Sequence, residues 1–430
     1  MQRHRFDYLF VLSVPWVALL SSVHGLRIGP LRHTGLFWLV TCFVGLILIA
    51  LRGPRKINFP WQWWAPLYLF LFCSLFWSQM NWKYNLQLYF QMTVYPIVGI
   101  VASYAIESHA EMKRMLRDYA WVLWGILAAY LFYTYGPGQS VQGADEDLYV
   151  GFAARPAAMT LIVTGAIFLS QVARRPVHSV LMWFISFLTA LLTGSRMVTL
   201  VVMSEWVTHP RLASIKARIG VVLLTMAIGL AAFNTPIIQD RFFMKKSGFS
   251  GKGTIGDVLK GKFDSAGRFD SWPKILEASQ ERPWFGHGVG ESAPYVYSIW
   301  APIDKPHNEY LKMFFDGGYT ALACYLLGLF GTLANLARLN RQADSQENWA
   351  ISAAYMAWVG FILMSLVDNP LVCGNNYLQP LFVLVGAANG LAARQIQRSS
   401  STSLASDETP AVSPIDSAPR PKLPQLVPLR

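Results

Sequence analysis

The chain has 430 residues, of which 53% are hydrophobic and only 14% are charged, and its mean hydropathy is +0.34. Because soluble globular proteins carry about 25% charged residues, this composition excludes an ordinary soluble enzyme and indicates a protein embedded in a bilayer. It also excludes a disordered chain and a disulfide-stapled secreted domain. The net charge of +12 does not indicate nucleic-acid binding, because most basic residues flank apolar segments.

Apolar runs predict the membrane-spanning segments in chain order. A transmembrane helix needs about 20 predominantly apolar residues, and about twelve runs approach that length. The seventh and eighth runs are short, so this pair is either two spans or a hairpin that does not fully cross. The fold class that we predict is an all-α polytopic membrane protein. Its spans lie at roughly 6–24, 35–51, 62–78, 86–106, 119–135, 152–172, 178–193, 196–208, 217–234, 310–336, 349–367 and 371–393.

These spans divide the chain into four regions. Residues 1–234 hold spans one to nine, residues 235–309 form one long loop, and residues 310–393 hold spans ten to twelve. The loop contains a helix-like stretch from Ser271 to Gln280 and a Gly-rich turn at 286–290, so we expect a partly helical external subdomain. The segment 394–430 is rich in Ser and Pro and is expected to be a disordered tail.

Lys and Arg residues predict the orientation. Placing both termini in the cytoplasm puts most basic residues of the short loops on the cytoplasmic side, as the positive-inside bias requires, and makes the long loop external. The first span follows Arg3 and Arg5 and has no small-residue cleavage site, so we interpret it as a signal anchor.

One polar cluster stands where the long loop meets the tenth span. Pro306 precedes His307 and Asn308, and a Pro at this point fixes the direction in which the chain enters the helix. His307 would then lie at the outer membrane surface, where its imidazole is suited to proton transfer near neutral pH. The alternative is a helix-capping or interfacial polar residue.

Several basic residues lie on the outer face despite the positive-inside bias: Arg196, Arg268, Arg155 and Lys83. An Arg at membrane depth is costly and is a functional candidate, although Arg196 could instead snorkel to the head groups and Arg268 could form a surface ion pair. Together these cations could reach one anionic site. The acidic run Asp145-Glu146-Asp147 has the letters of a metal-binding motif, but a solvated loop explains it better, and we predict no metal site.

Three segments together resemble the O-antigen ligase and O-antigen polymerase superfamily of membrane glycosyltransferases. The resemblance is strongest over about residues 185–335. The segments are Leu192-Thr193-Gly194-Ser195-Arg196; Gly267-Arg268 with Trp272 and Pro283-Trp284-Phe285-Gly286-His287-Gly288-Val289-Gly290; and His307-Asn308-Glu309-Tyr310-Leu311 followed by Asp316-Gly317-Gly318.

This resemblance implies a GT-C-like enzyme of the bacterial inner membrane with a periplasmic active site. Such enzymes use sugar chains carried on undecaprenyl pyrophosphate and need no nucleotide sugar, and they are thought to need no metal ion or other cofactor. Ligases transfer the chain to a sugar of lipid A–core, polymerases transfer it to another repeat unit, and related members glycosylate proteins. We favour the ligase. A secondary transporter is the rival from another class, but the longest loop of such a protein would connect two six-span halves.

The resemblance also implies roles for the site residues. Arg196 and Arg268 match the family's motifs and suit a pyrophosphate, because guanidinium groups bind phosphate bidentately and stay protonated. His307 would act as general base for the acceptor hydroxyl, which implies inversion at the anomeric carbon, or it would bind pyrophosphate as imidazolium. Asp368 could orient His307 or an Arg. Arg155, Lys83, Asn308 and Asp368 are the weaker candidates. The expected partners are the lipid-linked donor, lipid A–core and membrane lipids.

Overall fold

The computed structural model describes most of the chain. The described residues are 2–23, 27–28, 31–52, 57–79, 81–135, 154–193, 195–210, 268–301, 303–342, 349–372 and 374–407, with a few single positions between 216 and 227. Contacts between them divide the chain into two units, Met1–Ala392 and Ala393–Arg430. The packing described below belongs to the first unit.

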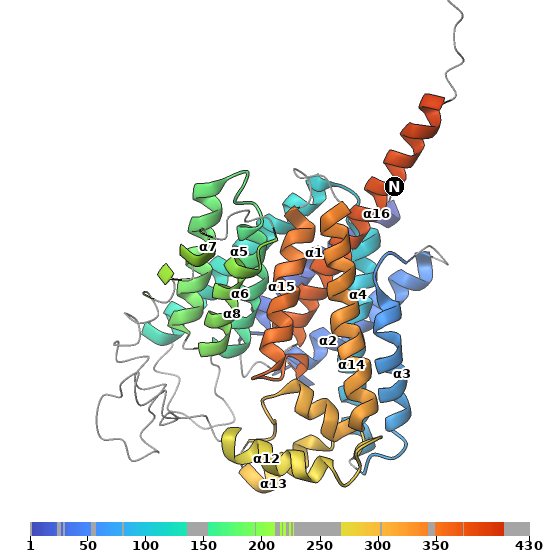
Figure 1. Ribbon diagram of the computed structural model, residues 1–430, viewed down its shortest axis with the longest axis vertical. Coiled ribbons are helices and arrows are strands. Elements are labelled where there is room, and N and C mark those ends of the chain that lie inside the picture. Colours follow the sequence, from blue (N-terminus) through green and yellow to red (C-terminus); the bar gives the residue numbers. More distant parts are fainter. Residues whose placement is uncertain are drawn as a thin grey trace, which may run out of the picture. The chain divides into compact units, whose positions relative to one another are not determined.

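Helices make up nearly all of the described structure (Figure 1). A two-residue hairpin, β1 (Arg27–Ile28) with β2 (Leu31–Arg32), is paired antiparallel. The helices are α1 (Gln2–Leu20), α2 (His33–Arg52), α3 (Ala65–Ser74) preceded by the short η1 (Trp61–Trp63), α4 (Trp82–Ala105), α5 (His109–Tyr135), α6 (Ala154–Leu169), α7 (Pro176–Leu192), α8 (Arg196–Thr208), α12 (Arg268–Ser279), α13 (Ser292–Trp300), α14 (Glu309–Gln342), α15 (Trp349–Ser365), η4 (Pro370–Val372), η5 (Gly374–Leu378) and α16 (Gln379–Asp407).

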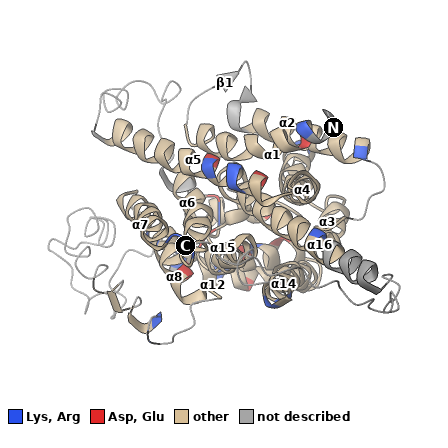
Figure 2. Ribbon diagram, turned by 90° about the horizontal axis from the view of Figure 1, so that it is seen from above, with Lys and Arg blue, Asp and Glu red and all other residues tan. Residues whose placement is uncertain are grey.

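These helices coincide with the apolar runs. Each predicted span overlaps a described helix except the ninth, 217–234, which lies almost entirely outside the described residues. Among the described helices, Gly35–Arg52, Trp82–Ala105 and Glu309–Gln342 are long and apolar enough to cross a membrane. Figure 2 shows that basic and acidic residues colour only a few turns of the described helices. The total of twelve spans stays a prediction.

The seventh and eighth predicted spans are short helices. With 17 and 13 residues, α7 and α8 rise only about 26 and 20 Å, less than the roughly 30 Å of a hydrocarbon core. They contact one another, since Trp183 Nε1 of α7 donates to Glu205 Oε2 of α8 at 3.1 Å. Their lengths keep open the alternative of a hairpin that does not fully cross.

Aromatic side chains join helices that are distant in the sequence. Trp64, at the start of α3, lies with its ring centroid 5.8 Å from that of Trp358 in α15 and 5.5 Å from that of Phe382 in α16. Its Nε1 donates to Thr332 Oγ1 of α14 at 2.9 Å. Because Trp64 and Trp358 are fully buried, this cluster fixes α14 and α15 beside each other, and these two helices lead to the candidate site.

At one end of α14 and α15, the helices α12 and α13 of the predicted external subdomain pack together (Figure 1). The helix expected at Ser271 to Gln280 is confirmed as α12. Residues 235–267 of the predicted loop lie outside the described part of the chain, and the external location of the subdomain stays a prediction.

The Gly-rich turn is inserted into a break in α14. The backbone N–H groups of His287 and Gly288 donate to the carbonyls of Phe315 and Asp316 at 3.0 and 2.8 Å. Gly318 interrupts α14 with φ 64° and ψ −162°, and a side chain there would collide with the backbone of Trp284. A positive φ and this close approach both require glycine, so the turn and the helix break fit each other.

The second unit begins near the predicted tail. The helix α16 continues to Asp407, so the first residues of the segment 394–430 are helical rather than irregular. Helix-forming residues such as Ala392, Arg394 and Gln395 extend the apolar span without a break. Residues 408–430 lie outside the described part, and their predicted disorder is untested.

Candidate functional site

The segment before α14 is held by side chains on both sides. Trp272 of α12 donates its Nε1 hydrogen to the carbonyl of Pro306 at 2.6 Å. Asn308 accepts a hydrogen bond from Leu311 N at 3.0 Å, which is the N-cap arrangement at the start of a helix. Between them, His307 has φ 51°, a backbone conformation that non-glycine residues seldom adopt. An unusual backbone held from both sides is frequent at functional sites.

The imidazole of His307 is bonded to Asp368, just beyond the end of α15. Nδ1 of His307 lies 3.1 Å from Oδ1 of Asp368, and the two side chains are only 15% and 18% exposed. Burial alone would raise the pKa of Asp368, but hydrogen bonds from His307 and Asn369 N, with the charges of His307 and Arg268, lower it below its ordinary value. An ionised carboxylate only accepts hydrogen bonds, so Nδ1 carries the hydrogen of this contact.

Asn369 fixes the backbone of the same histidine. Its side-chain Oδ1 accepts the N–H of His307 at 2.7 Å. Asn369 and Glu309 are both fully buried. Oε2 of Glu309 accepts hydrogen bonds from Asn369 Nδ2 at 3.5 Å and from Leu371 N at 3.2 Å. Neither Asn369 nor Glu309 was among the site residues predicted from the sequence. The available signal was that both adjoin a candidate, Asp368 and Asn308 respectively, at the junction of a span and a loop.

Arg268 lies close to this pair. It is the first residue of α12, it is half-buried, and its charge is one of the causes that lower the pKa of Asp368. Trp272, one helical turn later, binds the Pro306 carbonyl and so ties the start of α12 to the His307 segment. The structure therefore brings together three of the predicted residues: His307, Asp368 and Arg268.

Arg196 begins α8 directly after its N-cap residue Ser195. Two contacts show that α6 and α8 run parallel. Gly165 of α6 lies against Glu205 of α8. Earlier in both helices, Ile162 of α6 and Val201 of α8 lie against the same residue, Gly360. The start of α8 is thus at the same end of the bundle as the start of α6. The approach of the Arg196 guanidinium to His307 stays a prediction.

The weaker candidates are placed less closely. Arg155 lies in the first turn of α6, and its side chain is outside the described part of the structure. Lys83 is exposed in the first turn of α4, where its N–H donates to Asn81. Asn308 is used as the cap of α14, so a direct role in chemistry would compete with its structural one.

An apolar cavity of about 620 Å³ opens beside the site, between α12 and α14. Asn308, the residue after His307, is one of its lining residues, and the aromatic residues Trp272, Tyr310, Phe314 and Tyr319 form much of its wall. Such a wall suits the hydrocarbon part of an amphiphile or the face of a sugar ring.

Acidic, His and Cys side chains do not gather as metal ligands in the part of the chain that the structure describes: no group of three or more is found there. The acidic run Asp145-Glu146-Asp147 lies outside those residues. Our prediction that the site holds no metal ion therefore rests on the chemistry of its basic residues.

The described chain thus combines apolar helices, as in a membrane protein, with a largely buried His–Asp pair beside an Arg, a grouping of titratable side chains that is frequent in enzyme sites. Residues 181–326 match the family model for O-antigen ligase, and this confirms the predicted resemblance to the O-antigen ligase and polymerase superfamily. The matched region includes Arg196, Arg268 and His307, whereas Asp368 lies beyond it. No curated protein matches the chain. The family implies a glycosyltransferase-type enzyme that acts on a lipid-linked glycan.

Proposed function

We propose that the protein is an O-antigen ligase. It would transfer a polysaccharide from undecaprenyl pyrophosphate to a sugar of lipid A–core at the periplasmic face of the bacterial inner membrane. The observation that carries the proposal is the hydrogen bond of His307 to Asp368 beside Arg268, at the end of α14 and α15 and within reach of an apolar cavity. Glycosyl transfer from a lipid-pyrophosphate donor needs a base for the acceptor hydroxyl, a cation for the pyrophosphate and an apolar wall for the lipid.

His307 is the proposed general base. With Nδ1–H donating to Asp368, the neutral imidazole keeps its lone pair on Nε2, where it takes the proton of the acceptor hydroxyl. The acceptor oxygen forms a bond to the anomeric carbon, and the bond from that carbon to the pyrophosphate oxygen breaks, so the leaving group departs with the electron pair. Attack opposite the leaving group inverts the anomeric centre. Asp368 stabilises the imidazolium that forms, and such base catalysis contributes about 10²–10⁴ in rate.

Arg268 and Arg196 are the proposed pyrophosphate ligands. Negative charge grows on the leaving oxygen as the glycosyl bond breaks, and fixed guanidinium groups stabilise that charge without a metal ion. Loss of one preorganised contact of this kind costs about 10²–10³ in rate. Arg155 and Lys83 are second-rank candidates for the same anion.

An O-antigen polymerase that extends lipid-linked repeat units is the second candidate function, because it would use the same residues. A protein O-oligosaccharyltransferase comes third, and a secondary transporter is less favoured. The match to the O-antigen ligase family model supports a ligase- or polymerase-type function in general, and we favour the ligase on the sequence pattern.

Purified protein mixed with undecaprenyl-pyrophosphate-linked glycan and lipid A–core tests the proposal. Formation of a slower-migrating lipopolysaccharide band by wild type but not by His307→Ala, unchanged by EDTA, is the expected result. Longer lipid-linked glycan without a lipid A–core product would identify a polymerase. Glycan on a protein acceptor would identify the protein-glycosylating relative, and substrate flux without any product would identify a transporter.

The proposed orientation in the membrane is the one that the Lys and Arg residues predict. Both termini would face the cytoplasm, and α12, α13 and His307 would face the periplasm. Reaction of a single Cys introduced at exposed Asp304 with a membrane-impermeant thiol reagent in intact spheroplasts tests this placement. Labelling only after lysis would reverse the orientation.

A further inference from the structure

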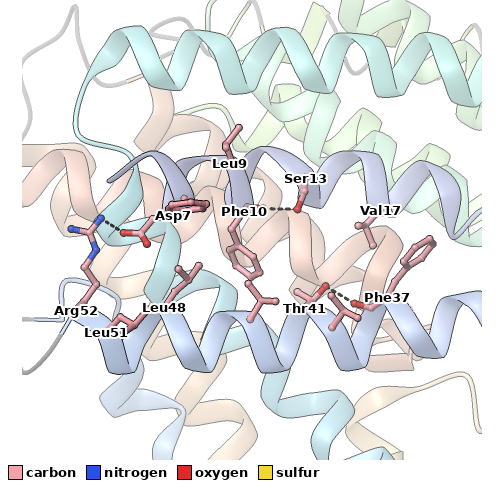
Figure 3. Close-up of a pocket in the computed structure, with 13 residues that line it drawn as sticks. Asp7, Leu9, Phe10, Ser13, Val17, Phe37, Thr41, Leu48, Leu51 and Arg52 are labelled. Atoms are coloured by element: carbon pink, nitrogen blue, oxygen red, sulfur yellow. Dashed lines mark hydrogen bonds and ion pairs between the residues drawn. The ribbon is translucent and has the colours of Figure 1, made fainter. Parts of the chain in front are cut away.

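A second cavity, which shares no lining residue with the one beside the site, lies between α1 and α2 (Figure 3). Its volume is about 500 Å³ and its wall is almost wholly apolar. The helix α2 packs chiefly against α4 rather than α1, which leaves a groove along the α1–α2 seam. The rim residues Phe6, Leu9, Val40 and Leu51 are exposed, so the groove opens sideways from the bundle.

The polar atoms along the groove are already satisfied. Ser13 Oγ donates to the carbonyl of Phe10 at 2.7 Å, and Thr41 Oγ1 donates to the carbonyl of Phe37 at 2.6 Å, as Figure 3 shows. Both hydroxyls thus bond to their own helix. An occupant needs no polar group along its length, which is the property of a hydrocarbon chain.

Charged residues gather at one end of the groove. Asp7 and Arg52 form an ion pair there, with side chains only 3% and 11% exposed. In the sequence, Arg3 and Arg5 lie within four residues of Asp7, and Arg55 and Lys56 lie within four residues of Arg52, so basic residues outnumber the one acid along these two stretches of the chain. Basic clusters between helix ends at a membrane surface favour anionic lipid head groups, and a guanidinium binds phosphate in a fork.

This charged end is opposite to the His307 site. At the other end of α1, Asn376 Nδ2 donates to the carbonyl of Ala18 at 2.7 Å, and Asn376 belongs to η5, which follows shortly after Asp368. Near the charged end, Tyr8 donates to the carbonyl of Glu111 at the start of α5. From Phe6 to Val17 the groove runs about 17 Å along α1, roughly half of a hydrocarbon core and hence one leaflet.

We propose that the α1–α2 groove binds an anionic phospholipid of the leaflet opposite the His307 site. One acyl chain lies between Phe10 and Val44, and the phosphate shares the guanidinium of Arg52 with Asp7. The ligand is a structural lipid bound outside the reaction site, so this assignment stands or falls separately from the proposed ligase activity.

Native mass spectrometry of the full chain in detergent tests the site, with palmitoyl-oleoyl phosphatidylglycerol and phosphatidylcholine as probes. We expect wild type to retain the anionic lipid at least about fivefold better, the factor expected for one basic residue at a membrane surface. Val40→Trp, which fills the groove from its rim, should lower retention of both lipids. The neighbouring Leu39→Trp is the matched control, because Leu39 is exposed but does not line the groove.

The double variant Asp7→Asn/Arg52→Gln removes both charges without leaving one of them buried alone. It should lose most of the preference for the anionic lipid, because the guanidinium that would bind the phosphate is gone. Equal retention of the two lipids by wild type, or an equal effect of Leu39→Trp and Val40→Trp, would overturn the assignment. Displacement of the lipid by inorganic phosphate alone would show an anion site that binds no acyl chain, and would overturn the assignment too. So would a dimer that Val40→Trp dissociates, because the groove would then bind a second copy of the protein.

A measurement on unaltered protein guards against a misfolded variant. Phosphatidylglycerol with a photoactivatable group on one acyl chain should crosslink to peptides of α1 and α2 and be displaced by excess unlabelled phosphatidylglycerol. Crosslinks spread over the other lipid-facing helices would refute a defined site.

Discussion

His307 and Asp368 are bonded side chain to side chain, with Nδ1 3.1 Å from Oδ1, although 61 residues separate them in the sequence. One precedes α14 and the other follows α15, so the antiparallel packing of these two helices creates the pair. The pair therefore depends on the buried contacts between α14 and α15, such as the bond from Tyr310 Oη to the carbonyl of Ile362 at 3.0 Å.

Asp368→Asn is expected to lower kcat by about 10² or more while the protein still folds. An amide keeps the shape but loses the charge that stabilises the imidazolium, and its NH₂ group favours the wrong imidazole tautomer. The turnover of lipid-linked glycan measures the effect. Asp304→Asn is the matched control, because Asp304 is an exposed acid in the segment that leads to His307, and its turnover should equal that of wild type. Equal turnover of the two variants would remove Asp368 from the site.

His307→Ala should abolish the base and with it the acidic limb of the pH–rate profile. If His307 is the base, the wild-type rate falls as pH is lowered and imidazole is protonated; if imidazolium binds pyrophosphate, the rate falls as pH is raised. The limb near neutral pH does not belong to Asp368. Its pKa is lowered below the ordinary value of about 3.9, so the stabilisation that its charge provides is present above that value and is lost only at lower pH.

His287 supplies the control for this histidine. Its Nε2 lies 3.1 Å from the carbonyl of Ala278, and its ring stacks on Phe315 with the centroids 4.4 Å apart. His287→Ala should therefore lower the melting temperature and leave the pH–rate profile in shape. A flattened profile in His287→Ala and an intact one in His307→Ala would exchange the two assignments.

Arg268→Lys is expected to reduce kcat/KM by roughly 10²-fold for the pyrophosphate donor, because lysine keeps the charge but loses the planar fork that binds phosphate. Arg282→Lys provides the comparison, since Arg282 is an exposed Arg of the same subdomain. Titration of each protein with undecaprenyl pyrophosphate, followed by product formation, gives the two values. A loss of the same size in Arg282→Lys would point to overall charge rather than to a defined contact.

Asn369→Ala is expected to lower kcat with little change in KM for either substrate. The substitution removes the oxygen that accepts the N–H of His307 at 2.7 Å. The positive-φ backbone then relaxes, and the imidazole is no longer held in its orientation toward the acceptor. We regard Asn369 as a positioning residue, and a fall of about tenfold fits a base displaced by a fraction of an ångström. A rise in KM with unchanged kcat would instead show that Asn369 contacts substrate.

Gly318→Ala should destabilise the fold by about 1–3 kcal/mol or more, because alanine strains the positive φ and its Cβ collides with Trp284. Gly35→Ala in α2 is the matched glycine, since a Cβ there meets nothing within 4 Å, and it should leave stability unchanged or slightly raised. Thermal unfolding in the same detergent compares the two. Similar melting temperatures would mean that the turn at 286–290 does not depend on the break in α14.

The helices were predictable from the sequence because apolar runs report burial in lipid directly. The start of α14 was predictable too, since Pro306 and a polar cluster mark a helix entry. The predicted end of the eleventh span at residue 367 also placed Asp368 at the junction of a span and a loop. The length of each run does not say whether a short helix crosses the bilayer, and α7 and α8 show that ambiguity.

The inner part of the site was not predictable in the same way. Asn369 and Glu309 look like ordinary polar residues at a helix end, and only the packing of α14 against α15 buries them and joins them. The sequence left open whether Asp368 orients His307 or an Arg. In the structure Asp368 is bonded to His307, and the charge of Arg268 also acts on it, so both interpretations hold. The sequence could not show this, because residues far apart in the chain meet only through tertiary packing.

The break at Gly318 has a mechanical consequence. A continuous helix tilts as a rigid rod when the bilayer becomes thicker or thinner. In α14 the residues 309–317 are bonded to the Gly-rich turn, whereas the longer part after Gly318 supplies most of a helix that is long and apolar enough to cross a membrane. We therefore expect the part of α14 after Gly318 to change its tilt with membrane composition while the His307 segment keeps its angle, so that the site would keep its geometry when bilayer thickness varies.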